Sequence, residues 1–76
     1  MKIRDFINLA MEQNDVFMQV WDIEEAYKVH GSPVVYEGYY ADIPEHLIDK
    51  IDNLEVCSWH TYIKNGYDAI CFNVEG

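Results

Sequence analysis

The sequence predicts an α+β domain in which an N-terminal helix packs on a small antiparallel sheet of three to five strands, with a short helix before a C-terminal β-hairpin. Three observations indicate this fold class. Apolar residues recur at helical spacing near the N-terminus, later runs are rich in β-branched and aromatic residues, and an Asn-Gly pair separates the last two runs. Because separate cores rarely form in chains below about 100 residues, we expect residues 1–76 to be a single domain.

The first predicted element is an amphipathic helix over residues 3–14. Its apolar side chains follow the i, i+3, i+4, i+7, i+8 pattern of one buried stripe. These residues are Ile3, Phe6, Ile7, Ala10 and Met11. Asp5 lies in the first turn, where a carboxylate interacts favourably with the helix dipole.

Two internal runs predict strands. Residues 16–22 are rich in β-branched and aromatic side chains, and residues 34–40 form a second run that Gly38 interrupts. A glycine inside a strand marks a bulge or a close approach of the backbone. Residues 24–30 fit either a ragged strand or a short helical turn, and the Gly-Ser-Pro sequence at 31–33 ends this segment.

A short helix is expected to begin near Pro44. Asp42 can accept a backbone N–H there, Glu45 can reach back three residues, and proline fits the first turn of a helix. One side of this helix is apolar and is predicted to face the core. It consists of Leu47, Ile48 and Ile51.

The strongest local signal is Asn65-Gly66, the preferred two-residue turn of a β-hairpin. This turn places Lys64 opposite Tyr67 and thereby sets the register of both strands. We assign the more apolar face of the hairpin to the core, with the opposed pairs Cys57–Val74, Trp59–Phe72, Thr61–Ile70 and Ile63–Asp68. The other face is mixed and carries the pairs Ser58–Asn73, His60–Cys71 and Tyr62–Ala69.

Composition restricts the possible partners. Fourteen acidic residues against five basic ones give a net charge of -9, while hydrophobic residues make up 50% of the chain and favour a folded domain. Such a charge repels phosphate backbones and anionic lipid, so we expect no direct nucleic-acid or membrane partner and instead a protein partner with a basic surface. No apolar run reaches membrane-spanning length, and two cysteines are too few for a secreted disulfide scaffold. A cytoplasmic location is expected.

His46, Cys57, His60 and Cys71 are residue types that bind zinc. Cys57 and His60 are three apart on a predicted strand, so their side chains point to opposite faces and cannot share an ion. We therefore expect no metal and no cofactor. A catalytic Cys71–His60 pair is a further possibility, but the sequence shows neither a third orienting group nor a pocket, and we expect the protein not to be an enzyme.

Aromatic residues beside acids form the candidate partner-binding surface. Tyrosine and tryptophan side chains can bury their apolar ring surface while their polar ends keep hydrogen bonds, which is typical of protein-recognition surfaces. Alternate tyrosines of a strand can equally fill a core. The candidate residues are Trp21, Asp22, Glu24, Glu25, Tyr36, Glu37, Tyr39, Tyr40 and Asp42.

Five short segments, spread over most of the chain, carry a resemblance to known proteins. They are Val-Trp-Asp at 20–22, Tyr-Glu-Gly-Tyr at 36–39, Asp-Ile-Pro at 42–44, Glu-Val-Cys-Ser at 55–58 and Asn-Gly at 65–66. The chain resembles small uncharacterised acidic proteins of Gram-positive bacteria and their phages or mobile elements. The resemblance implies an α+β fold and a mobile-element origin. Small acidic phage proteins include inhibitors of bacterial defence systems, and the resemblance implies no catalytic residue.

Three functions follow as expectations, in order of preference. The first is a noncatalytic protein-binding module, a phage-type inhibitor whose acidic, tyrosine-rich surface engages a basic partner. The second is a small structural or accessory subunit that self-associates through a sheet edge or exposed aromatic residues, and the third is an enzyme using His60 and Cys71. Acidic charge gathered on one face favours the inhibitor, whereas an apolar patch with dispersed charge favours the oligomer.

Overall fold

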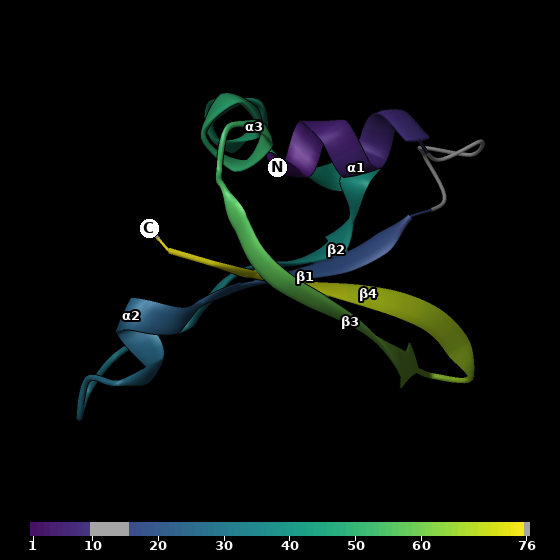
Figure 1. Ribbon diagram of the computed structural model, residues 1–76. Coiled ribbons are helices and arrows are strands. Elements are labelled where there is room, and N and C mark those ends of the chain that lie inside the picture. The colour runs from purple at the N-terminus through teal and green to yellow at the C-terminus, as the bar shows by residue number, and fades with distance from the viewer. Residues whose placement is uncertain (10–15, 76) are drawn as a thin grey trace.

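The computed structural model describes residues 1–9 and 16–75 and confirms the α+β class. Figure 1 shows two helices on one side of a four-stranded sheet. In chain order, the elements are α1 (Ile3–Leu9), β1 (Phe17–Asp22), α2 (Ile23–Ala26), β2 (Val34–Tyr39), the 3₁₀ helix η2 (Tyr40–Asp42), α3 (Glu45–Asp52), β3 (Val56–Lys64) and β4 (Tyr67–Val74).

The strand order is β2-β1-β4-β3, and the sheet is mixed. The outer pairs β1–β2 and β3–β4 are antiparallel, as expected, but the central pair β1–β4 is parallel. A turn motif in the sequence indicates that the two strands it joins are antiparallel. It carries no information on the relative direction of strands that are far apart in the chain. The parallel centre therefore arises from tertiary packing of the two antiparallel pairs.

The C-terminal hairpin has the predicted register from Lys64 opposite Tyr67 to Ser58 opposite Asn73. Asn65 and Gly66 both have positive φ, 52° and 82°, as the predicted turn requires. The register then shifts at Cys57, so that Val56, and not Cys57, lies opposite Val74. The predicted Cys57–Val74 pair is wrong because a β-bulge inserts one extra residue there.

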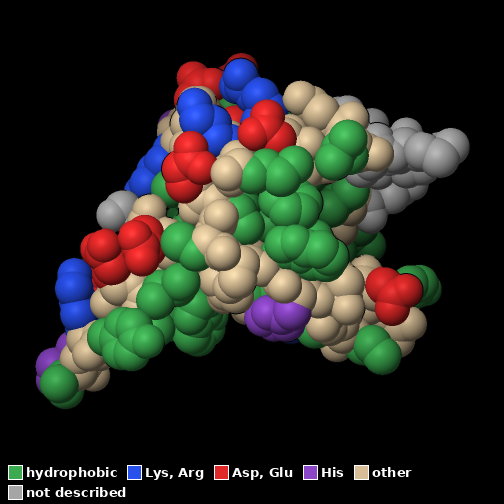
Figure 2. Space-filling view, viewed as in Figure 1, with side chains coloured by type: hydrophobic (Ala, Val, Ile, Leu, Met, Phe, Trp, Pro, Cys, Tyr) green, Lys and Arg blue, Asp and Glu red, His purple; other side chains and the backbone are tan. Residues whose placement is uncertain are grey.

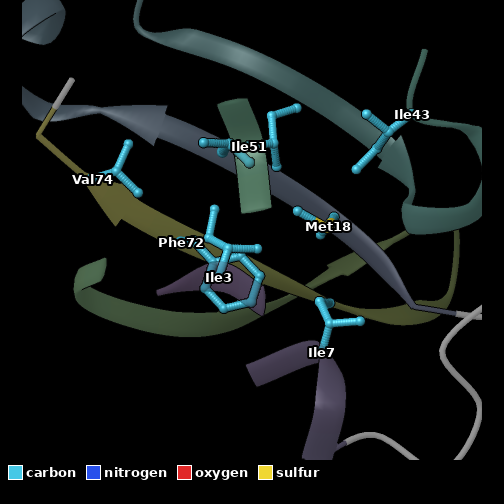
Figure 3. Close-up of a cluster of buried hydrophobic side chains, with 8 residues drawn as sticks. Ile3, Ile7, Met18, Ile43, Ile51, Phe72 and Val74 are labelled. Carbon is cyan, nitrogen blue, oxygen red and sulfur yellow. The ribbon is translucent and has the colours of Figure 1, made fainter. Parts of the chain in front are cut away.

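The core lies between the sheet and the helices α1 and α3 (Figure 3). Its buried residues are Ile3, Ile7, Met18, Val20, Ile43, Ile51, Phe72 and Val74. The predicted core face is thus correct for both strands of the hairpin, because Trp59 and Thr61 lie opposite Phe72 and Ile70, but the predicted burial of β3 is wrong. Trp59 is 52% exposed and Ile63 is 73% exposed, because β3 is an outer strand that the helices cover only in part. Trp59 contacts α1 through Phe6, with the ring centroids 5.8 Å apart.

Two local predictions can be compared with the described residues. The N-terminal helix is described to Leu9, and the predicted continuation over 10–14 lies outside the described residues. The ambiguous segment 24–30 begins as the short helix α2, which Asp22 caps by accepting hydrogen bonds from the backbone N–H groups of Glu24 and Glu25.

The predicted cap of the second helix is wrong. Asp42 belongs to η2, and the residue at the N-cap of α3 is Pro44, with no side-chain hydrogen bond. The 3₁₀ turn is favoured because it buries Ile43 in the core and directs the Tyr40 hydroxyl to the buried Asp52 carboxylate, 2.9 Å away. Tertiary contacts therefore outweigh the local capping preference.

The predicted close approach at Gly38 is confirmed. Its φ is 155°, and a Cβ atom there would lie 2.7 Å from the Tyr36 hydroxyl. That hydroxyl donates a 2.7 Å hydrogen bond to the backbone oxygen of Tyr39. The Tyr36 side chain thus covers the glycine, a packing that supports glycines in outer strands.

Candidate functional site

The second face of the sheet has no helix over it. Alternate residues of a strand point to opposite faces, so the residues between the core positions of β1, β2 and β4 and the even-numbered residues of β3 share this uncovered face. They are Phe17, Gln19, Trp21, Val34, Glu37, Tyr39, Ser58, His60, Tyr62, Lys64, Tyr67, Ala69, Cys71 and Asn73. Figure 2 shows the underside of the molecule hollowed between the projecting α2 segment and the turn of the β3–β4 hairpin, two segments that Figure 1 locates.

Glu37 is the centre of a hydrogen-bonded bridge across the uncovered face. One carboxylate oxygen accepts from Tyr62 Oη at 3.1 Å and Gln19 Nε2 at 3.2 Å, and the other accepts from Lys64 Nζ at 3.4 Å. Glu37 is on β2 and Tyr62 is on β3, at opposite edges of the sheet. Three steps of about 4.8 Å separate these strands in a flat sheet, so the side chains must lie along the face and the sheet must curl around them.

The bridge lies between two hollows. The first, of about 270 Å³, is lined by Gln19, Trp21, His60, Cys71 and Asn73. The second, of about 200 Å³, is lined by Phe17, Tyr39, Lys64, Asn65 and Tyr67. Each hollow has an aromatic wall and a polar wall, and the only charged side chains of the described uncovered face, Glu37 and Lys64, are paired with each other.

The aromatic wall of the second hollow is preorganised. The rings of Phe17 and Tyr39 meet edge to face, with centroids 5.2 Å apart at an interplanar angle of 89°. These two residues are also cross-strand partners in the β1–β2 pair. Tyr39 is 43% exposed and Tyr67 is 73% exposed, so both rings present area that a partner could cover.

The nine candidate residues fall into three groups. Trp21, Glu37 and Tyr39 lie on the uncovered face. Asp22, Glu24 and Glu25 lie immediately beyond it, at the start of α2. The remaining three are Tyr36, Tyr40 and Asp42.

Two residues of the third group, Tyr36 and Tyr40, make contacts that stabilise the domain itself. Tyr36 and Tyr40 pack against the core and use their hydroxyls within the protein, whereas Asp42 is exposed in η2. Burial, followed by the charge of Asp42, raises the pKa of Tyr36. Burial and the hydrogen bond to Asp52 raise the pKa of Tyr40 to about 12.

The acidic end at α2 is a separate feature on the helical side of the sheet. Asp22, Glu24 and Glu25 line a cavity of about 290 Å³ together with Lys28, Lys50 and the apolar Val35, Leu54 and Val74. Glu25 forms an ion pair with Lys28 at 3.1 Å, and Glu24 is exposed. Figure 2 shows acidic groups mixed with basic ones over the helical layer.

His60 and Cys71 are cross-strand neighbours, as predicted. Cys71 is 3% exposed, and its thiol lies 3.5 Å from Gln19 Oε1 and 3.8 Å from Asn73 Oδ1, to which it donates. Burial and, to a smaller extent, the charge of Glu37 raise the pKa of the Cys71 thiol. A protonated, covered thiol is a poor nucleophile, so this geometry gives no activation to Cys71.

The two cysteines are both free, with Cys57 exposed and Cys71 buried. Within residues 1–9 and 16–75, no three His, Cys, Asp or Glu side chains converge as ligands for a metal ion. In the same described segments, no helix is long and apolar enough to cross a membrane.

Sequence reasoning missed several residues of the uncovered face, notably Gln19, Tyr62, Lys64 and Tyr67. The signal for Tyr62 and Lys64 was present in the hairpin register, which placed them on the mixed face. The register alone does not predict their contact with Glu37. Tyr62 and Lys64 reach the Glu37 carboxylate only because β1 and β4 pair in parallel.

Comparison of the chain with protein-family models, curated proteins and solved structures finds no match.

Proposed function

We propose that the protein is a noncatalytic protein-binding module that holds a basic partner on the uncovered face of its sheet. The single observation that carries the proposal is the arrangement of two aromatic-walled hollows on either side of the Glu37 bridge. An inhibitor that covers a basic surface of its target would act in this way. The proposal keeps the partner-binding roles of Trp21, Glu37 and Tyr39.

The aromatic residues supply the binding energy in this proposal. Tyrosine and tryptophan dominate protein interfaces because they bury large areas with few rotatable bonds. Trp21 lines one hollow and Tyr39 the other, so a partner that fills both would span the Glu37 bridge. The bridge neutralises its own charges, and a partner can therefore cover it without leaving a lone carboxylate buried.

The acidic residues act mainly on the rate of association. With a net charge of -9, the chain attracts a basic surface from a distance, and exposed charges of this kind change association more than dissociation. Glu24 and Glu25 follow Trp21 closely in the chain and are among the carboxylates that contribute to this attraction. Asp22 is excluded from this role because it caps α2.

The first experiment isolates the partner from the native host by affinity capture and measures its affinity for matched variants. Trp21→Ala and Tyr39→Ala are each expected to weaken binding by about 2 kcal/mol, roughly thirtyfold, as for interfacial aromatic anchors. Leu9→Ala is the control, since Leu9 is 76% exposed on the helical layer. Equal affinities for all three variants would rule out the uncovered face as the binding surface.

The second experiment tests the charges. Glu24→Gln with Glu25→Gln is expected to slow association and to flatten its dependence on salt, because exposed charges interact over only about 8 Å at physiological ionic strength. The control is Glu45→Gln with Asp49→Asn, which removes the same charge from α3. An association rate that does not change with salt in the unmodified protein would remove the electrostatic part of the proposal.

A further inference from the structure

The outer strand β3 differs from the rest of this acidic chain. It is nine residues long, and no segment of the described chain pairs with it on the side away from β4 between Ser58 and Lys64. No acidic residue occurs from 56 to 67, although the chain contains 14. Two of its apolar side chains are exposed, Trp59 at 52% and Ile63 at 73%. A long, apolar edge strand is a template for pairing with another strand.

The direction of the free backbone groups follows from the register. Lys64 and Tyr67 flank a two-residue turn and form a hydrogen-bonded pair, and bonded pairs alternate along an antiparallel ladder. Tyr62, His60 and Ser58 therefore direct their backbone groups toward β4. The intervening Ile63, Thr61 and Trp59 direct theirs to the open edge.

The opposite edge of the sheet, β2, has protective features that β3 lacks. β2 has six residues, contains the charged Glu37 and Gly38, and has a register shift at Val35. Short length, charge and bulges are the usual means by which proteins prevent edge pairing. The one basic residue of β3, Lys64, is held by Glu37 on the uncovered face.

We propose that β3 pairs antiparallel with β3 of a second copy of this chain, with the two-fold axis at Thr61. Two observations define the segment that pairs. The N–H of Val56 already donates to the Met1 backbone oxygen at 2.8 Å, and the bulge at Cys57 interrupts the ladder. The uninterrupted segment is therefore Ser58–Lys64, whose middle residue is Thr61.

This register produces favourable cross-strand pairs. Thr61 lies opposite its own copy, and each Trp59 lies opposite Ile63 of the second copy, which covers the two exposed apolar side chains of the edge. Aromatic with β-branched pairs and Thr–Thr pairs both stabilise antiparallel sheets. The acid-free strand also keeps carboxylates of the two copies out of the contact. The result is one continuous eight-stranded sheet, and this inference does not depend on the proposed partner of the uncovered face.

The first test is the oligomeric state measured by sedimentation equilibrium over a range of protein concentrations. We expect a monomer–dimer equilibrium, and Ile63→Lys should raise the dimer dissociation constant by at least roughly tenfold because it places lysines on the pairing edge. Val34→Lys is the matched control on the other edge, where Val34 is 45% exposed, and should leave the constant unchanged. Circular dichroism spectra establish that both variants are folded.

The second test fixes the register by disulfide cross-linking in a Cys57→Ser background. Thr61→Cys should form a covalent dimer on mild oxidation, because directly opposed, hydrogen-bonded residues have Cα atoms about 5.5 Å apart, within reach of a disulfide. Ser58→Cys should not, because its expected neighbour is Lys64 of the second copy. The remaining Cys71 is 3% exposed and common to both variants.

Each outcome of these tests either supports or overturns the proposed pairing of β3. A wild-type chain that stays monomeric up to its solubility limit overturns the inference, and so does a dimer that Val34→Lys, rather than Ile63→Lys, dissociates. A dimer in which Ser58→Cys cross-links and Thr61→Cys does not overturns the register. Ile63→Lys also separates the two proposals, because a monomeric variant that still binds the captured partner retains the proposed function.

Discussion

The two faces of this sheet are made by alternate residues of the same strands, and they are held together by different forces. On the helical face, Met18, Val20 and Phe72 are at most 1% exposed and pack against α1 and α3. On the uncovered face, Glu37 and Tyr62 are joined by a hydrogen bond, and the Glu37 side chain remains in contact with water. Apolar burial therefore stabilises mainly the helical face, whereas the uncovered face is held by polar contacts that water can reach.

Phe72 provides the largest test of this comparison. Phe72→Ala is expected to lower the free energy of unfolding by about 3 to 5 kcal/mol, because it removes a buried ring that also contacts Phe6, 5.2 Å away between centroids. Trp59→Ala on the neighbouring strand should cost much less, since Trp59 is 52% exposed. Urea unfolding of both variants measures the difference. A greater loss for Trp59→Ala would show that β3 belongs to the core after all.

Two hydrogen-bonded carboxylates, Asp52 and Glu37, give the second test. Asp52 is 6% exposed and accepts from Tyr40 at 2.9 Å and Arg4 at 3.5 Å, so it ties α3 to η2 and α1. Asp52→Ala should cost about 1 to 3 kcal/mol, because it leaves a part-buried hydroxyl without its acceptor. Glu37→Ala should cost less than about 1 kcal/mol, because its side chain is 29% exposed and its partners can bind water.

The same urea measurements compare the two acids directly, with Glu45→Ala on the exposed side of α3 as the reference for loss of a carboxylate. Equal losses for Asp52→Ala and Glu37→Ala would mean that the bridge on the uncovered face is as much a part of the folded core as Asp52.

The sequence predicted the parts of this fold that depend on neighbouring residues. The hairpin register follows from Asn65-Gly66, and β4 has the expected core face because Phe72 and Val74 alternate with more polar residues. The burial of Trp59 was predicted incorrectly because the position of β3 at the sheet edge depends on contacts distant in sequence. Local rules likewise favoured Asp42 as a cap, whereas the packing of Tyr40 and Ile43 determined the turn.

The candidate site was predictable to a smaller degree for the same reason. Alternation along β1 places Trp21 on the same face as Gln19, and the hairpin register places Tyr62 on the same face as Lys64, but nothing local to either segment indicates that these two sets share one face. The parallel pairing of Gln19 with Cys71 brings them together. Sequence alone therefore predicts Trp21, Glu37 and Tyr39 as candidate residues, but not the bridge that Glu37 forms between the hollows of the other two.

The smallest expected effect comes from two tyrosine hydroxyls, one on each side of the sheet. Burial and hydrogen bonds to carboxylates raise the pKa of both Tyr40 and Tyr62 to about 12, from a usual value of about 10. The folded protein therefore holds these protons more tightly than the unfolded chain. This contribution to stability is complete below about pH 10 and is lost as the pH rises from about 10 toward 12. Unfolding should consequently become easier across that alkaline range.

Tyr40→Phe and Tyr62→Phe separate the two contributions. Tyr40→Phe should lower stability by about 1 kcal/mol at pH 8 and Tyr62→Phe by less, and each should make the alkaline loss less steep, because the raised pKa is removed with the hydroxyl. Tyr40→Phe should have the larger effect, since its acceptor Asp52 is 6% exposed whereas the side chain of Glu37 is 29% exposed. Urea unfolding at pH 8 and pH 11 measures both, with the exposed Tyr27→Phe as control. A larger effect for Tyr62→Phe would place the stronger polar contact on the uncovered face and reverse the comparison between the two sides of the sheet.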